Sequence, residues 1–461
     1  MRTQGGRGFQ YFENIVDTIG RTPLVRLNKV TRGLRPLVLA KVESFNPGGS
    51  VKDRIGYVII DAAEKAGLLH PGGTIIECTS GNTGVGLALV AAVRGYKLIC
   101  TMPDKMSQEK INLLKAYGAD VHIAPTAVPP DHPDSYYSVA KRLAREIPGA
   151  FHVNQYHNPD NPRAHYLTTG PEIWEQTGGQ VDVFVGGMGT GGTITGVGRY
   201  LKEKNPAVQI VGADPVGSIL CQYFYTRTMG EAHTYKIEGI GEDIIPSATD
   251  FDAIDRVVTI ADPEAYNLAR RVSREEGILI GSSGGAAVAA ALAVAREMGE
   301  DHVIVVLLPD TGERYLTKVH SDEWMRDNRL LDPHYLKVGE ILTRKAAGIP
   351  ALVSVGESDT IRRALELIKR YNISQLPVTR NGEIVGCVEE GAITSAVLED
   401  VHSLESPVQQ IMRDPLDKVA ASDPVDQAIK LLADRNAVLV EEVGEPRGIL
   451  TRIDLIEYVA V

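Results

Sequence analysis

One lysine of the chain lies where the fold could hold a reactive amine in place. Lys52 follows the turn Asn46-Pro47-Gly48-Gly49-Ser50, which comes after a predicted strand ending near Glu43 and precedes a predicted helix. Ser50 is a suitable N-cap for that helix, and the junction directs Lys52 back over the carboxyl edge of the sheet. An amine held there can form a Schiff base with an aldehyde. A solvated lysine on a capped turn is the alternative interpretation.

Three further turns carry glycine and hydroxyl groups, and two of them come directly after predicted strands. The turn 79–84 (TSGNTG) offers consecutive amides and hydroxyls that suit a carboxylate, unless it is an ordinary capped turn. The turn 186–193 (GGMGTGGT) brings glycine backbone to a helix N-terminus, which suits a phosphate. The turn 281–285 (GSSGG) opens an alanine-rich helix, and its small residues suit close packing around a planar ring.

The turn 186–193 also allows a different interpretation. Gly187-x-Gly189-x-x-Gly192 matches the dinucleotide-binding fingerprint, and Asp214 ends the next strand near where a ribose-binding acid would lie. A single match of this kind is weak evidence. The excess of glycine and threonine, together with the two turns upstream, favours one terminal phosphate over a pyrophosphate.

These turns belong to a long series of predicted strands and helices. Seven short runs are continuously apolar, so both faces of their sheet should be covered; the runs are 36–43, 73–80, 96–103, 119–125, 181–187, 208–215 and 302–310. Helical runs such as 53–67 and 107–118 separate several of them. The pattern predicts an α/β fold with an open, mostly parallel sheet, whose ligands bind at the carboxyl ends of the strands.

The pattern changes after about residue 320, where a polar stretch leads into an internal repeat. Residues 355–397 align with 419–459, and each copy predicts an amphipathic helix, a short β pair and a closing helix. We therefore divide the chain into a large domain at 1–325, a linker at 326–345, and two small domains at 346–400 and 401–461.

Composition limits the classes of partner and compartment. The 48 Lys and Arg residues against 59 Asp and Glu residues give a net charge of −11. This charge repels nucleic-acid backbones and anionic lipid, so we expect neither nucleic acid nor membrane as a partner. The four cysteines form no C-x-x-C pair, and the first residues lack the apolar core of a signal peptide. We expect reduced thiols, no metal site and a cytoplasmic protein.

Taken together, the four turns resemble those of the fold-type II pyridoxal-phosphate enzymes, and specifically of the cysteine synthase/cystathionine β-synthase group. The resemblance rests on PGGSVKDR, TSGNTG, GTGGT and the serine-glycine turn in this order, on NPRAHYLTTGPEIW and on EGIGED, and it covers residues 13–320. It implies a catalytic domain of two three-layer αβα subdomains with mostly parallel sheets. The C-terminal repeat resembles a tandem pair of CBS domains of α+β fold.

The resemblance also implies roles for individual residues. Lys52 would hold pyridoxal 5′-phosphate as an internal aldimine and move the Cα proton of the substrate, Asn82 would bind the 3′-oxygen, and Ser283 the pyridine nitrogen. The residues implied to bind the phosphate are Gly189, Thr190, Gly191, Gly192 and Thr193, and those implied to bind the substrate are Thr79, Ser80, Thr83, Gln155 and Tyr156. Because a serine cannot hold the ring nitrogen protonated, elimination should be favoured over transamination.

The implied activity is the condensation of L-serine with L-homocysteine to L-cystathionine and water, in transsulfuration and cysteine biosynthesis. The same site would suit a cysteine synthase that uses O-acetylserine or O-phosphoserine and sulfide, and the residues do not separate the two. An alternative of another class is a nucleotide-sensing module on an inactive catalytic relic, against which intact Lys52, Asn82 and Ser283 argue. A homodimer or homotetramer is implied by the family.

The two repeats differ in the motif with which CBS domains bind nucleotides. The second repeat has G-x-x-T-x-x-D complete, with Thr451 and Asp454, whereas the first has Glu389 and Ala392 at these positions. We expect one adenosyl site, with S-adenosylmethionine as the favoured effector; a purely structural or dimer-forming pair is the alternative. Heme-bearing members have an N-terminal Cys and His ligand, and no cysteine precedes Cys78 here, so we expect no heme.

Overall fold

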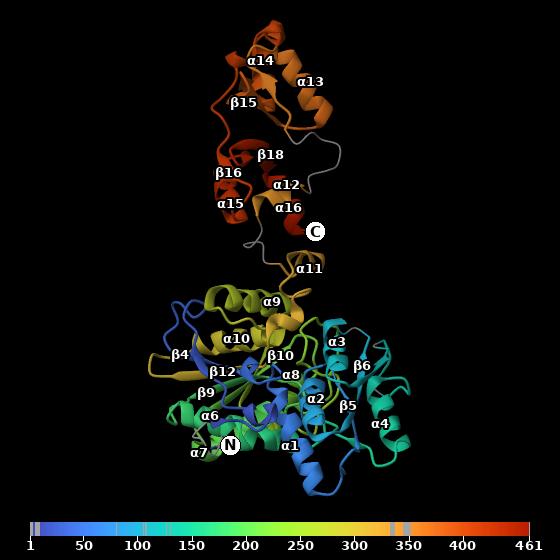
Figure 1. Ribbon diagram of the computed structural model, residues 1–461. Helices are drawn as coiled ribbons and strands as arrows, with labels where there is room; N and C mark the ends of the chain where they lie inside the picture. The colour runs from blue at the N-terminus through green and yellow to red at the C-terminus, as the bar shows by residue number, and fades with distance from the viewer. Residues whose placement is uncertain are drawn as a thin grey trace. The chain divides into compact units, whose positions relative to one another are not determined.

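The chain folds into two compact units, Met1–Leu330 and Leu331–Val461. The computed structural model describes residues 3–4, 10–79, 81–104, 106, 108–125, 127–129, 131–331, 337–343 and 352–460. Figure 1 labels the elements of both units. The first unit contains two parallel α/β sheets with their helices, which confirms the predicted fold class, and the second contains the two repeats.

The larger sheet of the first unit has six strands in the order β11-β10-β9-β12-β4-β3. The strands from β11 to β4 pair in parallel, and the edge strand β3 pairs antiparallel with β4. The strands are β3 (Leu24–Arg26), β4 (Leu37–Val42), β9 (Val183–Gly187), β10 (Gln209–Pro215), β11 (Arg256–Ile260) and β12 (Val303–Leu308). Strand β12 (VIVVLL) is buried along almost its whole length, as expected where helices cover both faces of a parallel sheet.

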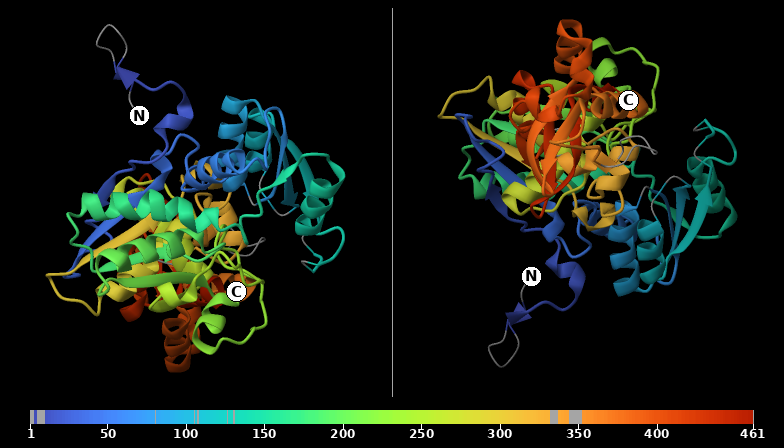
Figure 2. Two further views of the ribbon diagram at one scale, coloured as in Figure 1. Left: turned by 90° about the horizontal axis from the view of Figure 1, so that it is seen from below. Right: turned by 90° about the horizontal axis from the view of Figure 1, so that it is seen from above.

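The smaller sheet has four parallel strands in the order β7-β6-β5-β8. They are β5 (Thr74–Cys78), β6 (Lys97–Pro103), β7 (Asp120–Ala124) and β8 (Phe151–His152). In Figure 2 this sheet and its helices, coloured blue to teal, form a lobe beside the larger sheet. Each lobe has its own apolar core, so the two can hold residues against each other from separately packed frames.

The helices of the first unit connect these strands and cover the sheets. They are α1 (Lys52–Lys65), α2 (Asn82–Arg94), α3 (Gln108–Ala116), α4 (Tyr136–Glu146), α5 (Asp160–Leu167), α6 (Thr169–Gln176), α7 (Gly192–Lys204), α8 (Leu220–Thr226), α9 (Asp262–Arg271), α10 (Ser282–Ala295) and α11 (Asp322–Asp327). The alanine-rich α10 is almost entirely buried and contacts β9, β10 and β12. Alanine allows this close approach of a helix to a sheet because its side chain is small.

A close crossing of α1 and α2 fixes the start of α1. A Cβ atom at Gly86 of α2 would lie 2.5 Å from the carbonyl oxygen of Lys52, and one at Gly56 of α1 would lie 2.5 Å from the carbonyl carbon of Gly86. Real Cβ atoms do not approach backbone so closely, so glycine is required at both positions. The position of Lys52 is therefore set by backbone contact.

The second unit repeats one arrangement twice. Its sheets are ordered β13-β14-β15 and β16-β17-β18, with a parallel first pair and an antiparallel second pair in each. The register shifts at the same place in both, between Val378 and Thr379 and between Val440 and Glu441. This agreement confirms the predicted repeat. The elements are β13 (Val355–Gly356), α13 (Ile361–Tyr371), β14 (Gln375–Arg380), β15 (Glu383–Glu389), α14 (Glu390–Glu399), β16 (Lys418–Ala420), α15 (Val425–Asp434), β17 (Ala437–Glu442), β18 (Glu445–Thr451) and α16 (Arg452–Ala460).

A short helix, α12 (Val338–Thr343), precedes the first repeat in the chain but packs on the second. Val338 and Ile341 lie in the apolar core of the second repeat. The amide of Val338 donates to the carbonyl of Asp423 at 3.0 Å. The predicted linker 326–345 lies partly outside the described residues, at 332–336 and 344–345, and the predicted domain boundaries stay a prediction.

All seven runs predicted as strands contain strands, namely β4, β5, β6, β7, β9, β10 and β12. The two predicted helices named above are found as α1 and α3. Strands β3, β8 and β11 and the hairpin of β1 (Thr3–Gln4) and β2 (Gln10–Tyr11) were not predicted. None of the helices in the described part of the chain combines the length and apolar character needed to cross a membrane.

Candidate active site and C-terminal cavity

Lys52 is the first residue of α1, which follows the turn after β4. The N-cap residue is Val51 rather than the predicted Ser50, but Ser50 Oγ accepts the amide hydrogen of Lys52 at 3.2 Å. Burial lowers the pKa of Lys52 to about 8, against the opposing effect of the carboxylates of Glu242 and Glu77. A buried amine with such a pKa has a substantial neutral fraction near neutral pH, which a nucleophile or a base requires.

The turn after β5 brings together three of the predicted substrate-binding residues. The Thr83 hydroxyl donates to Gln155 Oε1 at 2.7 Å, and Thr79 Oγ1 accepts the amide of Gly81 at 3.0 Å. Gln155 in turn donates to the Cys78 carbonyl at 3.2 Å. Ser80 lies outside the described residues.

Tyr156 follows Gln155 and is buried in a small aromatic cluster. Its ring centroid lies 5.4 Å from that of Tyr137 in an edge-to-face arrangement. Burial raises the pKa of the Tyr156 hydroxyl well above its ordinary value. The side chain therefore stays a neutral hydrogen-bonding group.

The turn after β9 leads directly into the start of α7. Gly191 has a left-handed backbone, with φ of +80°, and a Cβ at Gly192 would overlap the amide of Asn161. No side chain in the described part of the chain caps the first amides of α7. Glycine is therefore needed here for two reasons, and the uncapped amides suit a phosphate.

Two hydroxyls of this turn are held by side chains from α5. Asn161 donates to Thr190 Oγ1 at 3.0 Å, and His165 Nε2 lies 3.2 Å from Thr193 Oγ1. Burial lowers the pKa of His165 well below its ordinary value, so the imidazole is neutral. The hydroxyls of the turn 186–193 are thus kept in place by neutral side chains, so α5 adds no charge there.

Ser283 lies in the first turn of α10 and is 4% exposed. The neighbouring Ser282 accepts the amide hydrogen of Glu238 at 3.1 Å. The hydroxyl of Ser283 lies beside Gly239, 4.0 Å from where a Cβ of that glycine would be. The two adjacent serines therefore serve different partners.

Sequence reasoning missed an ionic cluster that joins the two lobes. Lys110 of α3 and Lys318 both contact Glu238, at 2.5 Å and 2.7 Å. Although burial alone raises the pKa of Glu238, the two lysines outweigh it and lower the pKa. A Cβ at Gly81 would touch the stem of Lys110, so this ionic cluster lies beside the turn 79–84.

A second missed cluster surrounds Asn82, the first residue of α2. Its amide contacts Asp310, which follows β12, and Arg314. Asp310 stands at the carboxyl end of a parallel strand, as do the turns 79–84 and 186–193, and that position was the signal that could have identified it.

Among the described residues, one group has the composition of a metal site. Single ligand atoms of Glu77, Cys78 and His152 lie within 4.8 Å of one another. Glu77 already accepts the amide hydrogens of Asn154 and Gln155, at 2.7 Å and 3.4 Å. The absence of a metal site stays a prediction.

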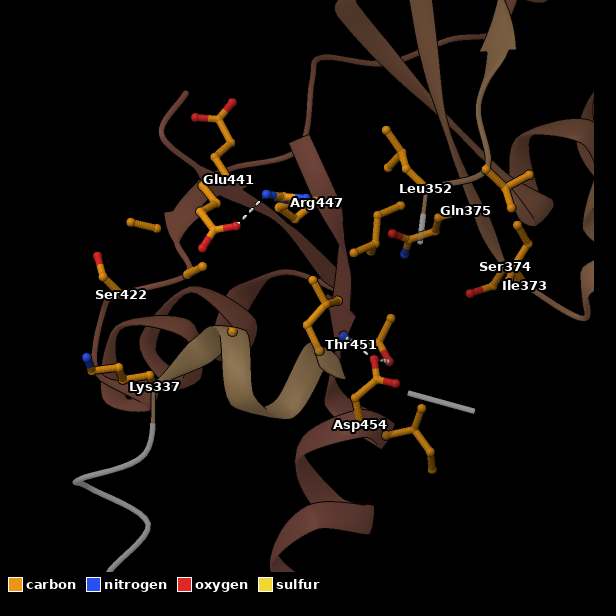
Figure 3. A pocket seen from close by; sticks show the side chains of 18 of the residues that line it. Lys337, Leu352, Ile373, Ser374, Gln375, Ser422, Glu441, Arg447, Thr451 and Asp454 are labelled. Carbon is orange, nitrogen blue, oxygen red and sulfur yellow. Dashed lines mark hydrogen bonds and ion pairs between the residues drawn. The ribbon is translucent and has the colours of Figure 1, made fainter. Parts of the chain in front are cut away.

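The second unit contains a cavity of about 1000 Å³ (Figure 3). Residues from α12 and from both repeats line it, including Leu342, Ser374 and Ser422, and so does Lys337, which precedes α12. Thr451 and Asp454 also line it, and both the amide and the hydroxyl of Thr451 donate to Asp454 Oδ2 at 2.6 Å. The two predicted nucleotide-binding residues thus lie together on one wall of a cavity.

Comparison with known proteins finds a matching family for each of the two parts of the chain. The family described as "Pyridoxal-phosphate dependent enzyme" matches residues 15–310, and the family "CBS domain" matches 338–399 and 408–461. The chain is 40% identical to cystathionine beta-synthase of Dictyostelium discoideum over 459 residues, covering 97% of this chain and 92% of that protein. It is 41% identical to cystathionine beta-synthase of Oryctolagus cuniculus over 471 residues, covering 97% and 85%.

A solved structure resembles the first unit. The O-acetylserine dependent cystathionine beta-synthase from Helicobacter pylori is 39% identical, with a TM-score of 0.63, and the match covers 67% of this chain and 99% of that one. The family match, the parallel lobes and the C-terminal repeat agree with one another. The chain therefore belongs to the cystathionine β-synthase family of pyridoxal-phosphate-dependent enzymes.

Proposed function

We propose that the protein condenses L-serine with L-homocysteine to form L-cystathionine and water, with pyridoxal 5′-phosphate as its cofactor. The observation that carries this choice is the extent of the similarity to cystathionine beta-synthase, which includes the C-terminal repeat and spans 97% of the chain. In the reaction the C–O bond at Cβ of serine breaks and a C–S bond to homocysteine forms. The serine hydroxyl leaves as water.

The residues present fit the cofactor. The glycine turn before α7 suits its phosphate because its N-cap, Gly191, has no side chain to cap the first amides of the helix. Asn82 would bind the 3′-oxygen, and Ser283 the pyridine nitrogen. Lys52 would hold the cofactor through its amine. When bound, pyridoxal phosphate withdraws electrons from Cα of the amino acid.

Lys52 would also carry the proton of the reaction. A pKa of about 8 leaves roughly one amine in ten neutral at pH 7, whereas an ordinary lysine would be almost wholly charged. The neutral amine would take the proton from Cα, and the ammonium would return it after the C–S bond has formed. The backbone contact between Lys52 and Gly86 supports this role, since it fixes the backbone from which the amine extends.

Thr79, Ser80, Thr83, Gln155 and Tyr156 would bind the amino-acid substrate, chiefly through its carboxylate. The buried turn and the two ammonium groups of Lys110 and Lys318, which meet at Glu238 beside it, support this proposal. A positive field in a site of low polarity attracts a carboxylate.

A second candidate function is β-replacement on O-acetylserine or O-phosphoserine, with sulfide as the nucleophile. The similarity to an O-acetylserine dependent enzyme of Helicobacter pylori supports this second candidate. The third alternative, a sensor on a catalytic relic, requires a protein without turnover.

A product assay with purified, cofactor-loaded protein separates these functions. One reaction offers serine and homocysteine, and a parallel one offers O-acetylserine and sulfide at equal concentrations. We expect cystathionine to form faster than cysteine. Cysteine alone would establish the second candidate, and the absence of both products in a protein that binds no cofactor would establish the sensor.

The cavity of the second unit would take S-adenosylmethionine as an effector, with Asp454 and Thr451 near the ribose. The lining of the cavity by both residues supports this. Isothermal titration with S-adenosylmethionine and, separately, with AMP tests it. If neither titration shows heat, the alternative of a purely structural or dimer-forming pair of CBS domains would remain. The proposal includes no heme, a cytoplasmic location, and a homodimer or homotetramer.

A further inference from the structure

The side-chain amide of Asn82 is held between two charged side chains, which come from the C-terminal part of the first unit's sequence. Its Nδ2 donates to Asp310 Oδ2 at 2.8 Å. The guanidinium of Arg314 donates to its Oδ1. Asp310 is 1% exposed and Arg314 is 8% exposed, so water competes little for either contact.

These two partners allow only one orientation of the amide. A carboxylate accepts hydrogen bonds and a guanidinium only donates them. Rotating the amide by half a turn would set its N–H groups against Arg314 and its carbonyl oxygen against Asp310. Both contacts would become repulsive in a site of low polarity, where such contacts are strong.

Further contacts keep the two charged groups themselves in place. The hydroxyl of Tyr315 donates to Asp310 Oδ2 at 2.5 Å. Arg314 also donates to the carbonyl oxygen of Gly48, in the turn that leads to Lys52. One guanidinium therefore joins the turn before the lysine to the start of α2.

The fixed orientation decides what Asn82 can offer a ligand. Its oxygen is engaged by Arg314 and one amide hydrogen by Asp310, so the group can meet a further oxygen only through its second N–H. A donor at this place stabilises an ionised oxygen over a protonated one. Resting on the proposed function, we propose that Asp310 and Arg314 are positioning residues that hold Asn82 as a hydrogen-bond donor to the 3′-oxygen of pyridoxal phosphate.

The test measures the absorption spectrum of the cofactor-loaded protein. The bound cofactor absorbs at longer wavelength when its 3′-oxygen is ionised and at shorter wavelength when that oxygen is protonated. Arg314→Met removes the group that excludes the flipped amide. We expect the ratio of the long-wavelength to the short-wavelength band to fall about tenfold, as for the loss of one charge-assisted hydrogen bond. Arg314→Lys, which keeps a charged donor, should restore most of the ratio.

A double-substitution cycle shows whether Arg314 acts through Asn82. Asn82→Ala alone should lower the ratio, and adding Arg314→Met to it should cause no further fall. A further fall of similar size would mean that Arg314 acts independently, and would overturn the proposal. If Arg314→Met does not fold, Asp310→Asn serves the same cycle, since a neutral amide no longer selects one orientation.

Two controls separate this proposal from the proposed function. Arg256→Met removes an exposed arginine paired with Glu297 and should leave the spectrum unchanged. Cofactor content is measured separately after alkaline release. A wild-type protein that stays colourless after reconstitution would refute the proposed function, whereas a yellow wild type and an equally yellow, fully loaded Arg314→Met would refute the positioning role alone.

Discussion

The candidate active site is fixed mainly by backbone and buried charge, whereas the cavity of the second unit is lined by side chains near the surface. Gly86 and Gly192 leave no room for a Cβ, and Glu238 is mostly buried with its lysines. Around the cavity, Arg447 pairs with Glu442 through side chains that are 60% and 52% exposed. Exposed ion pairs contribute little to stability, whereas disrupting a buried one is costly. Substitutions in the first region should therefore affect turnover and folding, and those in the second should affect ligand affinity.

The largest expected effect is that of Lys52→Ala. Removing the residue that carries the proton should lower kcat about a thousand-fold or more, measured as cystathionine formed from serine and homocysteine. Lys65→Ala is the matched control, since Lys65 belongs to the same helix and its side chain is 77% exposed. A loss of less than about tenfold in Lys52→Ala would mean that another group carries the proton.

The contrast in stability is tested by Glu238→Gln, which leaves two mostly buried ammonium groups without their carboxylate. We expect the free energy of unfolding at neutral pH to fall by about 3 kcal/mol, measured by urea denaturation. The exposed pair of Arg256 and Glu297 provides the control, and Glu297→Gln should cost less than about 1 kcal/mol.

The same variant has a defined pH dependence. Because the lysines lower the pKa of folded Glu238, its contribution is present above the ordinary pKa of glutamate and is lost as the pH falls through the lower, folded value. The difference between wild type and Glu238→Gln should therefore shrink in acid. An unchanged difference there would show that shape, not charge, holds the cluster.

A smaller effect concerns how the cofactor-free protein takes up pyridoxal phosphate. The aldehyde reacts with the neutral amine, and burial lowers the pKa of Lys52 to about 8. The rate of yellow colour formation should rise about tenfold per pH unit below pH 8 and level off above it. A rate that keeps rising toward pH 10 would indicate an ordinary, solvated lysine.

The smallest effect is expected in the second unit. Asp454→Ala should weaken binding of S-adenosylmethionine about tenfold, the loss of one hydrogen bond to a charged group, measured by isothermal titration. Asp417→Ala is the matched control, because Asp417 pairs with Arg435 and does not line the cavity. Equal affinities of the two variants for S-adenosylmethionine would show that Asp454 does not bind this ligand.

Most of the fold could be predicted from the sequence because buried parallel strands are continuously apolar. Strand β12, VIVVLL, is a clear example. The strands that were missed are short or lie at a sheet edge, as β3 and β8 do. Such strands bury little surface, so their sequences carry little apolar pattern. Strand β11, RVVTI, has an exposed Thr259 as its fourth residue, which interrupts the run.

The candidate site was predictable where its residues lie in one turn and not where they meet across the fold. Thr79, Thr83 and the glycines before α7 stand within short motifs. Asp310 contacts Asn82 across 228 residues, and Lys110 contacts Glu238 across 128. Only the tertiary packing of separate elements brings such charges together. The spacing of residues within a short motif therefore does not predict these contacts.

The packing of α12 has a consequence for how the chain can be shortened. Leu330 ends the first unit, and the next described helix already belongs to the core of the repeat that is last in sequence. A chain truncated after residue 400 would lack the apolar residues that Val338 and Ile341 contact. These side chains would then be exposed, and the truncated chain would be prone to aggregation. Cutting before Leu331 removes both sides of that contact. A stable minimal enzyme should therefore end near Leu330, and the tandem repeats should be deleted or transplanted together with the segment that begins at Leu331.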